Sequence, residues 1–256
     1  MSVLSYLQTR ATGAMLNSAE QVSINTSIST LQTRLNGYFG TKLSEHFRFG
    51  SSTRGTILPR AMDDHSDIDY MIVFADNGYT PQTYLDRLRR FVETYYSTSD
   101  IKQSTPTIVL QLNHIKFDLV PALKGIWSGY RIPNGTTSWQ DTNPNDFNST
   151  LTAKNQAELS LIKPTIRLAK FWNAQAGYVY DSFSFEKWIV AQSYILASNQ
   201  KDYLFAIFDK LNATESVQWR NDRITRAKQI VAKVREYERE NMPYTAESEV
   251  KKLIPE

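Results

Sequence analysis

Residues 47–74 read FRFGSSTRGTILPRAMDDHSDIDYMIVF and place two carboxylates where an apolar strand begins. Asp67 and Asp69 stand one residue apart, just before the apolar run at residues 70–74. Isolated carboxylates are costly at the entrance to a core. Because side chains alternate between the faces of a strand, these two point the same way, about 6.5–7 Å apart at Cα. Two such carboxylates repel each other unless they share a cation.

A third carboxylate, Asp118, interrupts another apolar strand in the sequence KFDLV at residues 116–120. If this strand neighbours the first in one sheet, the three acidic side chains converge. An all-oxygen cluster of this kind suits Mg²⁺ or Mn²⁺, with substrate phosphates completing the coordination. Two such ions would orient an attacking hydroxyl and neutralise charge on a phosphoryl group and its leaving group. The alternative for Asp67 is an ordinary acid at the edge of a strand, because Asp-X-Asp alone is common.

Gly50 and Ser51 lie upstream of these carboxylates, in a stretch rich in Ser, Thr and Gly. A Gly-Ser turn that leads into a short helix exposes backbone N–H groups and a hydroxyl to phosphate oxygens. Taken alone, the pair is well explained by an ordinary turn. Together with the carboxylates, it indicates a site for a phosphorylated ligand.

Composition bounds the class of protein. The chain has 256 residues, 41% of them hydrophobic, which is enough for one large domain or two small ones. The net charge of +3 is too weak to indicate strong nucleic-acid binding. The absence of cysteine excludes disulfides and thiolate metal sites. No stretch approaches the ~18 apolar residues of a membrane-spanning helix and no signal peptide is evident, so we expect a cytoplasmic protein without a membrane partner.

The sequence pattern predicts an α/β (α+β) fold with a mixed sheet and a long N-terminal helix. Strands are expected at 69–74 and, as a hairpin, at 107–112 and 115–120, with Val120-Pro121 closing the last strand. Residues 124–148 are expected to form a loop. Helices are expected at about 17–46, 81–96, 150–173, 183–198, 201–211 and 221–240. Because strands are predicted only in the first half, we expect a mixed core at 1–145 and a helical lobe at 146–256.

Several stretches together resemble a known family. They are FRFGSSTRGT (47–56), SDIDYMIVF (66–74), IKFDLVPA (115–122), SWQDTNPNDFN (138–148), LIKPTIRLAKFWN (161–173) and DSFSFEKWI (181–189). The set is similar to the DNA polymerase β-like nucleotidyltransferases. Within them it resembles the branch of cyclic GMP-AMP synthase, oligoadenylate synthetase and the cGAS/DncV-like nucleotidyltransferases (CD-NTases) of bacterial anti-phage signalling (CBASS). The resemblance implies a polymerase β-like core and a C-terminal helical lobe that closes over a nucleotide site.

The resemblance also implies roles for individual residues. Asp67 and Asp69 would bind both of two Mg²⁺ or Mn²⁺ ions, and Asp118 would bind the catalytic ion and help to deprotonate the acceptor hydroxyl. Ser51 and the backbone of Gly50 would hold the β- and γ-phosphates of a nucleoside triphosphate.

In the helical lobe, the resemblance implies three further contacts with the nucleotide. Lys170 would reach the triphosphate, although it could also be a solvent-exposed lysine of an amphipathic helix. Ser182 would face an anion in the first turn of a helix, or simply cap that helix. Phe183 would stack on a nucleobase, or pack in the core.

The implied reaction is attack of a ribose hydroxyl on the α-phosphate of a nucleoside triphosphate, with release of pyrophosphate and, after a second round, a cyclic di- or oligonucleotide second messenger. Related enzymes that make linear oligonucleotides or modify a small molecule are the nearest alternatives, and an inactive nucleotide-binding scaffold is an alternative of another class. Base preference, ring size, 2′–5′ or 3′–5′ linkage, activation, a regulatory protein partner and oligomeric state stay open.

Overall fold

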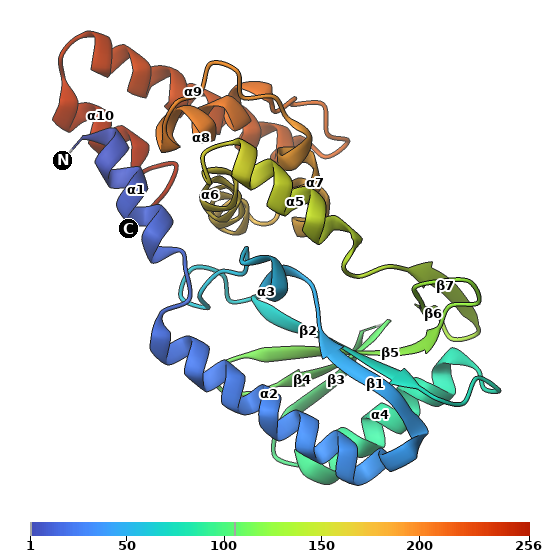
Figure 1. The fold of residues 1–256 in the computed structure, drawn as a ribbon. Coiled ribbons are helices and arrows are strands. Elements are labelled where there is room, and N and C mark those ends of the chain that lie inside the picture. The colour runs from blue at the N-terminus through green and yellow to red at the C-terminus, as the bar shows by residue number, and fades with distance from the viewer. Residues whose placement is uncertain (1, 105) are drawn as a thin grey trace. The chain divides into compact units, whose positions relative to one another are not determined.

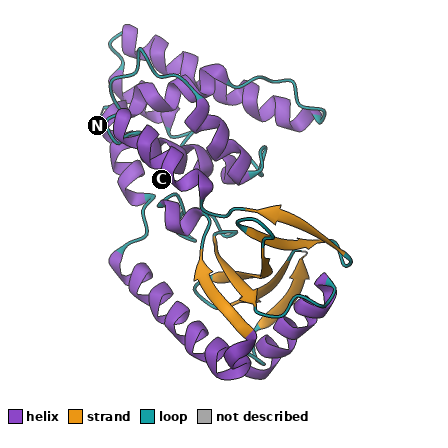
Figure 2. Ribbon diagram, turned by 45° about the vertical axis from the view of Figure 1, so that its right-hand side comes forward, coloured by secondary structure: helices purple, strands orange, loops and turns teal. Residues whose placement is uncertain are grey.

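The computed structural model describes residues 2–104 and 106–256, whose contacts divide the chain into two compact units. The first, here called the core unit, comprises residues 17–60 and 64–149 and holds every strand of the described residues (Figure 2). The second, here called the helical unit, is formed by residues 2–16, 61–63 and 150–256. Residues 2–16 thus group with the helical unit, whereas the sequence division placed the whole of 1–145 in the core.

A mixed sheet forms the centre of the core unit (Figure 1). Five strands follow the order β1-β2-β5-β4-β3; β6 pairs with β5, and β7 with β6. The strands are β1 (Leu43–Arg48), β2 (Asp67–Phe74), β3 (Asp100–Ser104), β4 (Thr107–Gln111), β5 (Lys116–Lys124), β6 (Tyr130–Asn134) and β7 (Ser138–Thr142). Only the β2–β5 pair is parallel among the pairings described. The predicted mixed sheet and α+β class are confirmed.

Helices α2 (Ser18–Phe39) and α4 (Pro81–Tyr95) pack against the sheet and each other. Their buried residues recur every three or four positions, as an amphipathic helix requires. The Phe39 ring of α2 lies 5.3 Å from Phe74 of β2 and 5.7 Å from Phe91 of α4, centroid to centroid. Burial on both faces explains why residues 70–74 form a continuous apolar run.

The helix predicted over residues 17–46 is too long. It ends at Phe39 because Gly40 adopts φ +53° as its C-cap, a conformation that favours glycine. A short 3₁₀ turn, η1 (Gly40–Lys42), leads into β1, which pairs antiparallel with β2. The prediction missed β1 because its residues are half-buried or exposed and none is fully buried, so its alternation is weak.

The predicted loop at 124–148 is also wrong in part, because it contains the antiparallel hairpin of β6 and β7. The preceding strand β5 continues to Lys124 instead of ending at Pro121. Proline cannot donate a hydrogen bond to a neighbouring strand. It is tolerated here because β4 pairs with β5 only as far as Leu119.

The helical unit surrounds a core of its own. Its helices are α1 (Val3–Gly13), α5 (Asp146–Ala157), α6 (Ile162–Gln175), α7 (Ser182–Ala191), α8 (Gln200–Lys210), α9 (Gln218–Arg239) and α10 (Pro243–Val250). The part of α5 that belongs to this unit begins at Thr150. Helix α1 contacts α6, α8 and α10, and the Tyr6 hydroxyl donates a hydrogen bond of 2.7 Å to the carbonyl of Ile254. These contacts explain why the first residues group with this unit. No helix in the described part of the chain has the length and apolarity to cross a membrane.

The helix predicted over 150–173 is broken between α5 and α6. Leu159 and Ser160 adopt φ values of +53° and +62° there. Pro164 lies in the first turn of α6, where its missing N–H costs nothing, but in a continuous helix its ring would clash with the carbonyl of Ser160.

Helices α1 and α10 and strand β3 were not predicted.

Candidate active site

The parallel pairing of β2 with β5 brings the acidic residues of two separate segments together. In its register, Asp67 lies beside Lys116 and Asp69 beside Asp118. Residues paired in this way, and residues two apart in one strand, share a face of the sheet. Asp67, Asp69, Asp118 and Lys116 therefore form one charged group on one face, here called the acidic face.

Lys116 forms ion pairs within the acidic face. Its Nζ lies 3.0 Å from Oδ2 of Asp67 and 3.7 Å from Oδ1 of Asp118. Burial by itself lowers the pKa of Lys116, but the charges of Asp67 and Asp118 outweigh it and raise that pKa above its ordinary value. Sequence reasoning missed Lys116, although its position two residues before Asp118 in a strand placed it on the same face.

The carboxyl group of Asp118 has a perturbed pKa. Burial is the largest cause, the negative charge of Asp67 is the second, and together they raise the pKa of Asp118 to about 6. The positive charge of Lys116 acts in the opposite direction. The Oδ1 of Asp118 is buried and accepts no hydrogen bond from the described residues. Buried oxygens without a hydrogen bond are rare in proteins, and this one instead faces a cation, the Lys116 ammonium, 3.7 Å away.

Gly50 lies against Asp69. Its φ is +73°, and a Cβ added there would lie 1.9 Å from Oδ2 of Asp69. The backbone N–H of Phe49 donates a hydrogen bond of 3.0 Å to the Asp69 carbonyl, which fixes this approach. Gly50 is the N-cap of α3 (Ser51–Arg54), so Ser51 directly follows the residue that lies against Asp69.

The acidic face fits divalent cations. Its carboxylates supply the oxygen donors that Mg²⁺ and Mn²⁺ prefer. The buried Oδ1 of Asp118 accepts no hydrogen bond within the described part of the chain and faces the Lys116 ammonium, so it can coordinate a cation. The ammonium of Lys116, held between Asp67 and Asp118, shows that a positive charge is accommodated between these two side chains.

Replacing Asp118 by asparagine is expected to stabilise the metal-free protein at pH 8. The raised pKa means that the folded state holds the Asp118 proton more tightly than the unfolded state. That stabilisation is complete below pH ~4 and is lost as the pH rises through about 6. Asp118→Asn, which stays neutral, should therefore gain on the order of 1–3 kcal/mol at pH 8 and much less at pH 4.5. Thermal unfolding in EDTA at both pH values measures this; a variant less stable at pH 8 would contradict it.

The residues predicted in the helical unit lie in α6 and α7. Lys170 is 7% exposed, so it is not a solvent-exposed lysine. Phe183 is 43% exposed and does not pack in the core, and the Lys187 ammonium lies 5.6 Å from its ring centroid. Ser182 is the first residue of α7, but the N-cap is Asp181, whose carboxylate accepts a hydrogen bond of 2.8 Å from the N–H of Ser184.

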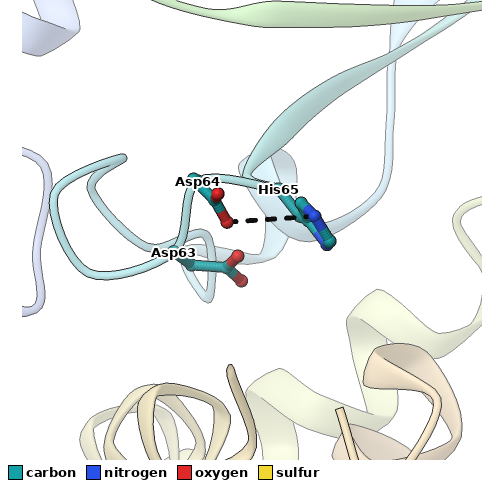
Figure 3. A group of neighbouring side chains, drawn as sticks. All are labelled: Asp63, Asp64 and His65. Carbon is teal, nitrogen blue, oxygen red and sulfur yellow. Dashed lines mark ion pairs between the residues drawn. The ribbon is translucent and has the colours of Figure 1, made fainter. Parts of the chain in front are cut away.

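A second group of possible ligands was not predicted. Asp63, Asp64 and His65 follow one another in the loop before β2, and their ligand atoms lie within 4.8 Å of one another (Figure 3). The side chains of Asp64 and His65 are 81% and 66% exposed. The Tyr178 hydroxyl already donates a hydrogen bond of 2.6 Å to Asp63. Water and Tyr178 can thus satisfy this group without an ion, although three adjacent ligand-type residues could have been noticed in the sequence.

Comparison with solved structures identifies similar folds. CdnC of Escherichia coli MS115-1, in the CdnC:HORMA-deltaN complex, matches with a TM-score of 0.74 and 18% identity over 99% of this chain and 97% of that chain. CdnG of Bradyrhizobium diazoefficiens, in complex with GTP, matches with a TM-score of 0.71 and 11% identity over 97% of both chains. At such low identity the similarity concerns the fold alone.

Sequence comparison identifies the family. A probable cyclic nucleotide synthase of Bacillus cereus (strain VD146) is 27% identical over 177 residues, and the chain spans about half (52%) of the length of this relative. The model of the Second Messenger Oligonucleotide or Dinucleotide Synthetase domain (SMODS) matches residues 1–155, more than half of the chain. Together with the fold and the acidic face, this match shows that the chain belongs to the SMODS family of cGAS/DncV-like nucleotidyltransferases, as its sequence motifs predicted.

Proposed function

We propose that this protein joins nucleoside triphosphates into a cyclic di- or oligonucleotide second messenger, releases pyrophosphate and depends on two Mg²⁺ or Mn²⁺ ions. The proposal includes a role in bacterial anti-phage signalling (CBASS) and a cytoplasmic location. The observation that carries it is the β2–β5 register, which unites Asp67, Asp69 and Asp118 beside the Gly50 turn. Membership of the SMODS family and similarity to a probable cyclic nucleotide synthase support the same reaction.

In this proposal, Asp67, Asp69 and Asp118 hold the divalent ions. When bound, such ions orient the attacking hydroxyl and neutralise charge on the phosphoryl group and the leaving pyrophosphate. Asp118 helps to accept the proton of the ribose hydroxyl, as a carboxylate positioned beside that hydroxyl can do. Catalysis by this chain then consists mainly of positioning and charge compensation.

The phosphates of the donor nucleotide are proposed to bind at Gly50 and Ser51. The positive φ of Gly50 turns the chain sharply before α3, and only glycine leaves room there for the Asp69 carboxylate. The backbone at this turn and the Ser51 hydroxyl supply hydrogen-bond donors for phosphate oxygens. A ligand that bridges Ser51 and the acidic face would bring its phosphates to the ions.

We assign the remaining nucleotide contacts to the helical unit. Lys170, whose side chain is 7% exposed, is proposed to bind the triphosphate, because an ammonium is a compact positive charge that suits phosphate oxygens. The exposed ring of Phe183 is available for stacking on a nucleobase. Ser182 is proposed as an anion contact at the start of α7, although the neighbouring Asp181 carboxylate opposes negative charge there.

The similar structures bear on ligands and regulation. GTP is bound to CdnG in one, which supports nucleoside triphosphates as substrates of this chain. The other is a complex of CdnC with HORMA-deltaN, which makes a protein partner the first kind of regulator to look for.

The test is an assay of products. The protein is incubated with the four labelled nucleoside triphosphates and Mg²⁺ or Mn²⁺, and the labelled products are separated before and after treatment with phosphatase. A cyclic product lacks terminal phosphates, so we expect a labelled species that resists phosphatase and a matched release of pyrophosphate. A labelled product with a free terminal phosphate would indicate linear oligonucleotides, and no product would indicate a scaffold. Either result would refute the proposed function.

A further inference from the structure

Lys116 is a charged residue of the acidic face to which the proposed function gives no task. It lies directly beside Asp67 in the parallel register and two residues before Asp118 in β5. Its Nζ is 3.0 Å from one carboxylate and 3.7 Å from the other. A single ammonium thus bridges two of the three side chains proposed to bind divalent ions.

This bridge differs from a surface ion pair. The side chain of Lys116 is 22% exposed, and those of Asp67 and Asp118 are 27% and 21% exposed. In contrast, Lys102 and Asp100 on β3 form a pair of 2.9 Å whose side chains are 72% and 57% exposed. Water screens the second pair strongly and the first much less. The charge of Lys116 therefore interacts strongly with the carboxylates of the acidic face.

The geometry points to Lys116 as a resident cation that holds Asp67 and Asp118 in place before divalent ions bind and then competes with those ions for the same oxygens. This inference rests on the proposed function, because it takes the acidic face to be the metal site. Lys116 is a positioning residue here, since it acts through the two carboxylates.

Charge explains what such a lysine achieves. The three carboxylates alone would carry a charge of −3, which repels within the face but attracts a free divalent ion strongly. Lys116 reduces this to −2, which relieves the repulsion and weakens the attraction for an ion that arrives alone. A bound nucleoside triphosphate adds its own negative charge. This charge shifts the competition between Lys116 and the divalent ions in favour of the ions. Lys116 thus couples binding of divalent ions to binding of the nucleotide.

The experiment measures Mn²⁺ binding without nucleotide, by the electron paramagnetic resonance signal of free Mn²⁺. Lys116→Gln keeps much of the side chain and removes its charge, so we expect it to bind Mn²⁺ roughly tenfold more tightly than the natural protein. Lys116→Arg keeps the charge and should bind as the natural protein does. Lys102→Gln removes a charge from the exposed pair and should also leave Mn²⁺ affinity unchanged.

A second readout is thermal stability. Without metal, Lys116→Gln should melt at a lower temperature than the natural protein, because its carboxylates repel, and Mn²⁺ should raise that temperature more than it does for the natural protein. A purely structural role would lower stability without tightening Mn²⁺ binding. Equal or weaker Mn²⁺ binding by a folded Lys116→Gln overturns the inference.

One further variant separates this inference from the proposed function. Asp67→Asn combined with Asp69→Asn should abolish Mn²⁺ binding at the acidic face. If the double variant loses Mn²⁺ binding while Lys116→Gln binds Mn²⁺ with the affinity of the natural protein, only the role of Lys116 is refuted. If the double variant binds Mn²⁺ as well as the natural protein, the acidic face is not the metal site, and both the proposed function and the role of Lys116 fail.

Discussion

Replacing Asp67 and Asp69 together by alanine is expected to lower the rate of product formation at least about a thousandfold. Both side chains lie on the acidic face, and Asp69 is paired in register with Asp118. Their removal leaves one carboxylate beside the ammonium of Lys116. Since a neutralised pair cannot hold a divalent cation, orientation of the hydroxyl and compensation of phosphoryl charge are lost together.

The loss is measured as release of pyrophosphate from nucleoside triphosphates at saturating Mg²⁺. Asp100→Ala on β3 is the matched control, because it removes a carboxylate from an exposed lysine pair in the same unit. Its activity should stay within about twofold of the natural protein, as expected for a surface change. Activity of the double variant close to that of the control would show that the chemistry takes place elsewhere.

Replacing Gly50 by alanine is expected to lower activity about a hundredfold while the protein stays folded. The new Cβ would lie 1.9 Å from Oδ2 and 2.8 Å from Cγ of Asp69, so the carboxylate or the turn must move. A displacement of about 1 Å in a catalytic group costs on the order of a hundredfold in rate. Binding of a triphosphate at the turn should weaken as well, because its backbone shifts.

Gly55 provides the control for this substitution. Its φ of +72° matches the +73° of Gly50, but no atom lies within 4 Å of an added Cβ. Alanine at Gly55, where ψ is +29°, pays only the penalty of the left-handed helical region, about 1–2 kcal/mol. At Gly50, where ψ is −153°, the conformation is almost restricted to glycine and the penalty is larger. Activity and thermal unfolding of Gly50→Ala and Gly55→Ala are compared. If both lose the same activity, backbone strain is responsible and the close approach of Gly50 to Asp69 has no catalytic importance.

The elements with strong local signals were predicted well. The apolar run that forms β2 is buried on both faces, and Pro81 marks the start of α4 at the expected residue. The hairpin of β4 and β5 was expected at Asn113-His114 and is found around that turn. In each case composition or a turn residue determines the local structure without help from distant parts of the chain.

The elements with weak local signals were not predicted. Strands β1, β6 and β7 have mixed burial, so their alternation of polar and apolar residues is indistinct. They form because a neighbouring strand offers hydrogen bonds: β2 to β1, β5 to β6, and β6 to β7. Helix α1 is held by the hydrogen bond that the Tyr6 hydroxyl donates to the carbonyl of Ile254. These two residues are 248 positions apart, so no local sequence pattern can predict their contact.

At the site, the residue types and the shared face of Asp67 and Asp69 could be predicted from the sequence, since alternation along a strand is a local property. The position of Asp118 beside them follows from the fold, because β2 and β5 are far apart in the chain and pair side by side. The same pairing placed the Lys116 ammonium between two carboxylates. Charge interactions depend on distance through space, and that distance is set by the pairing of strands rather than by their order in the sequence.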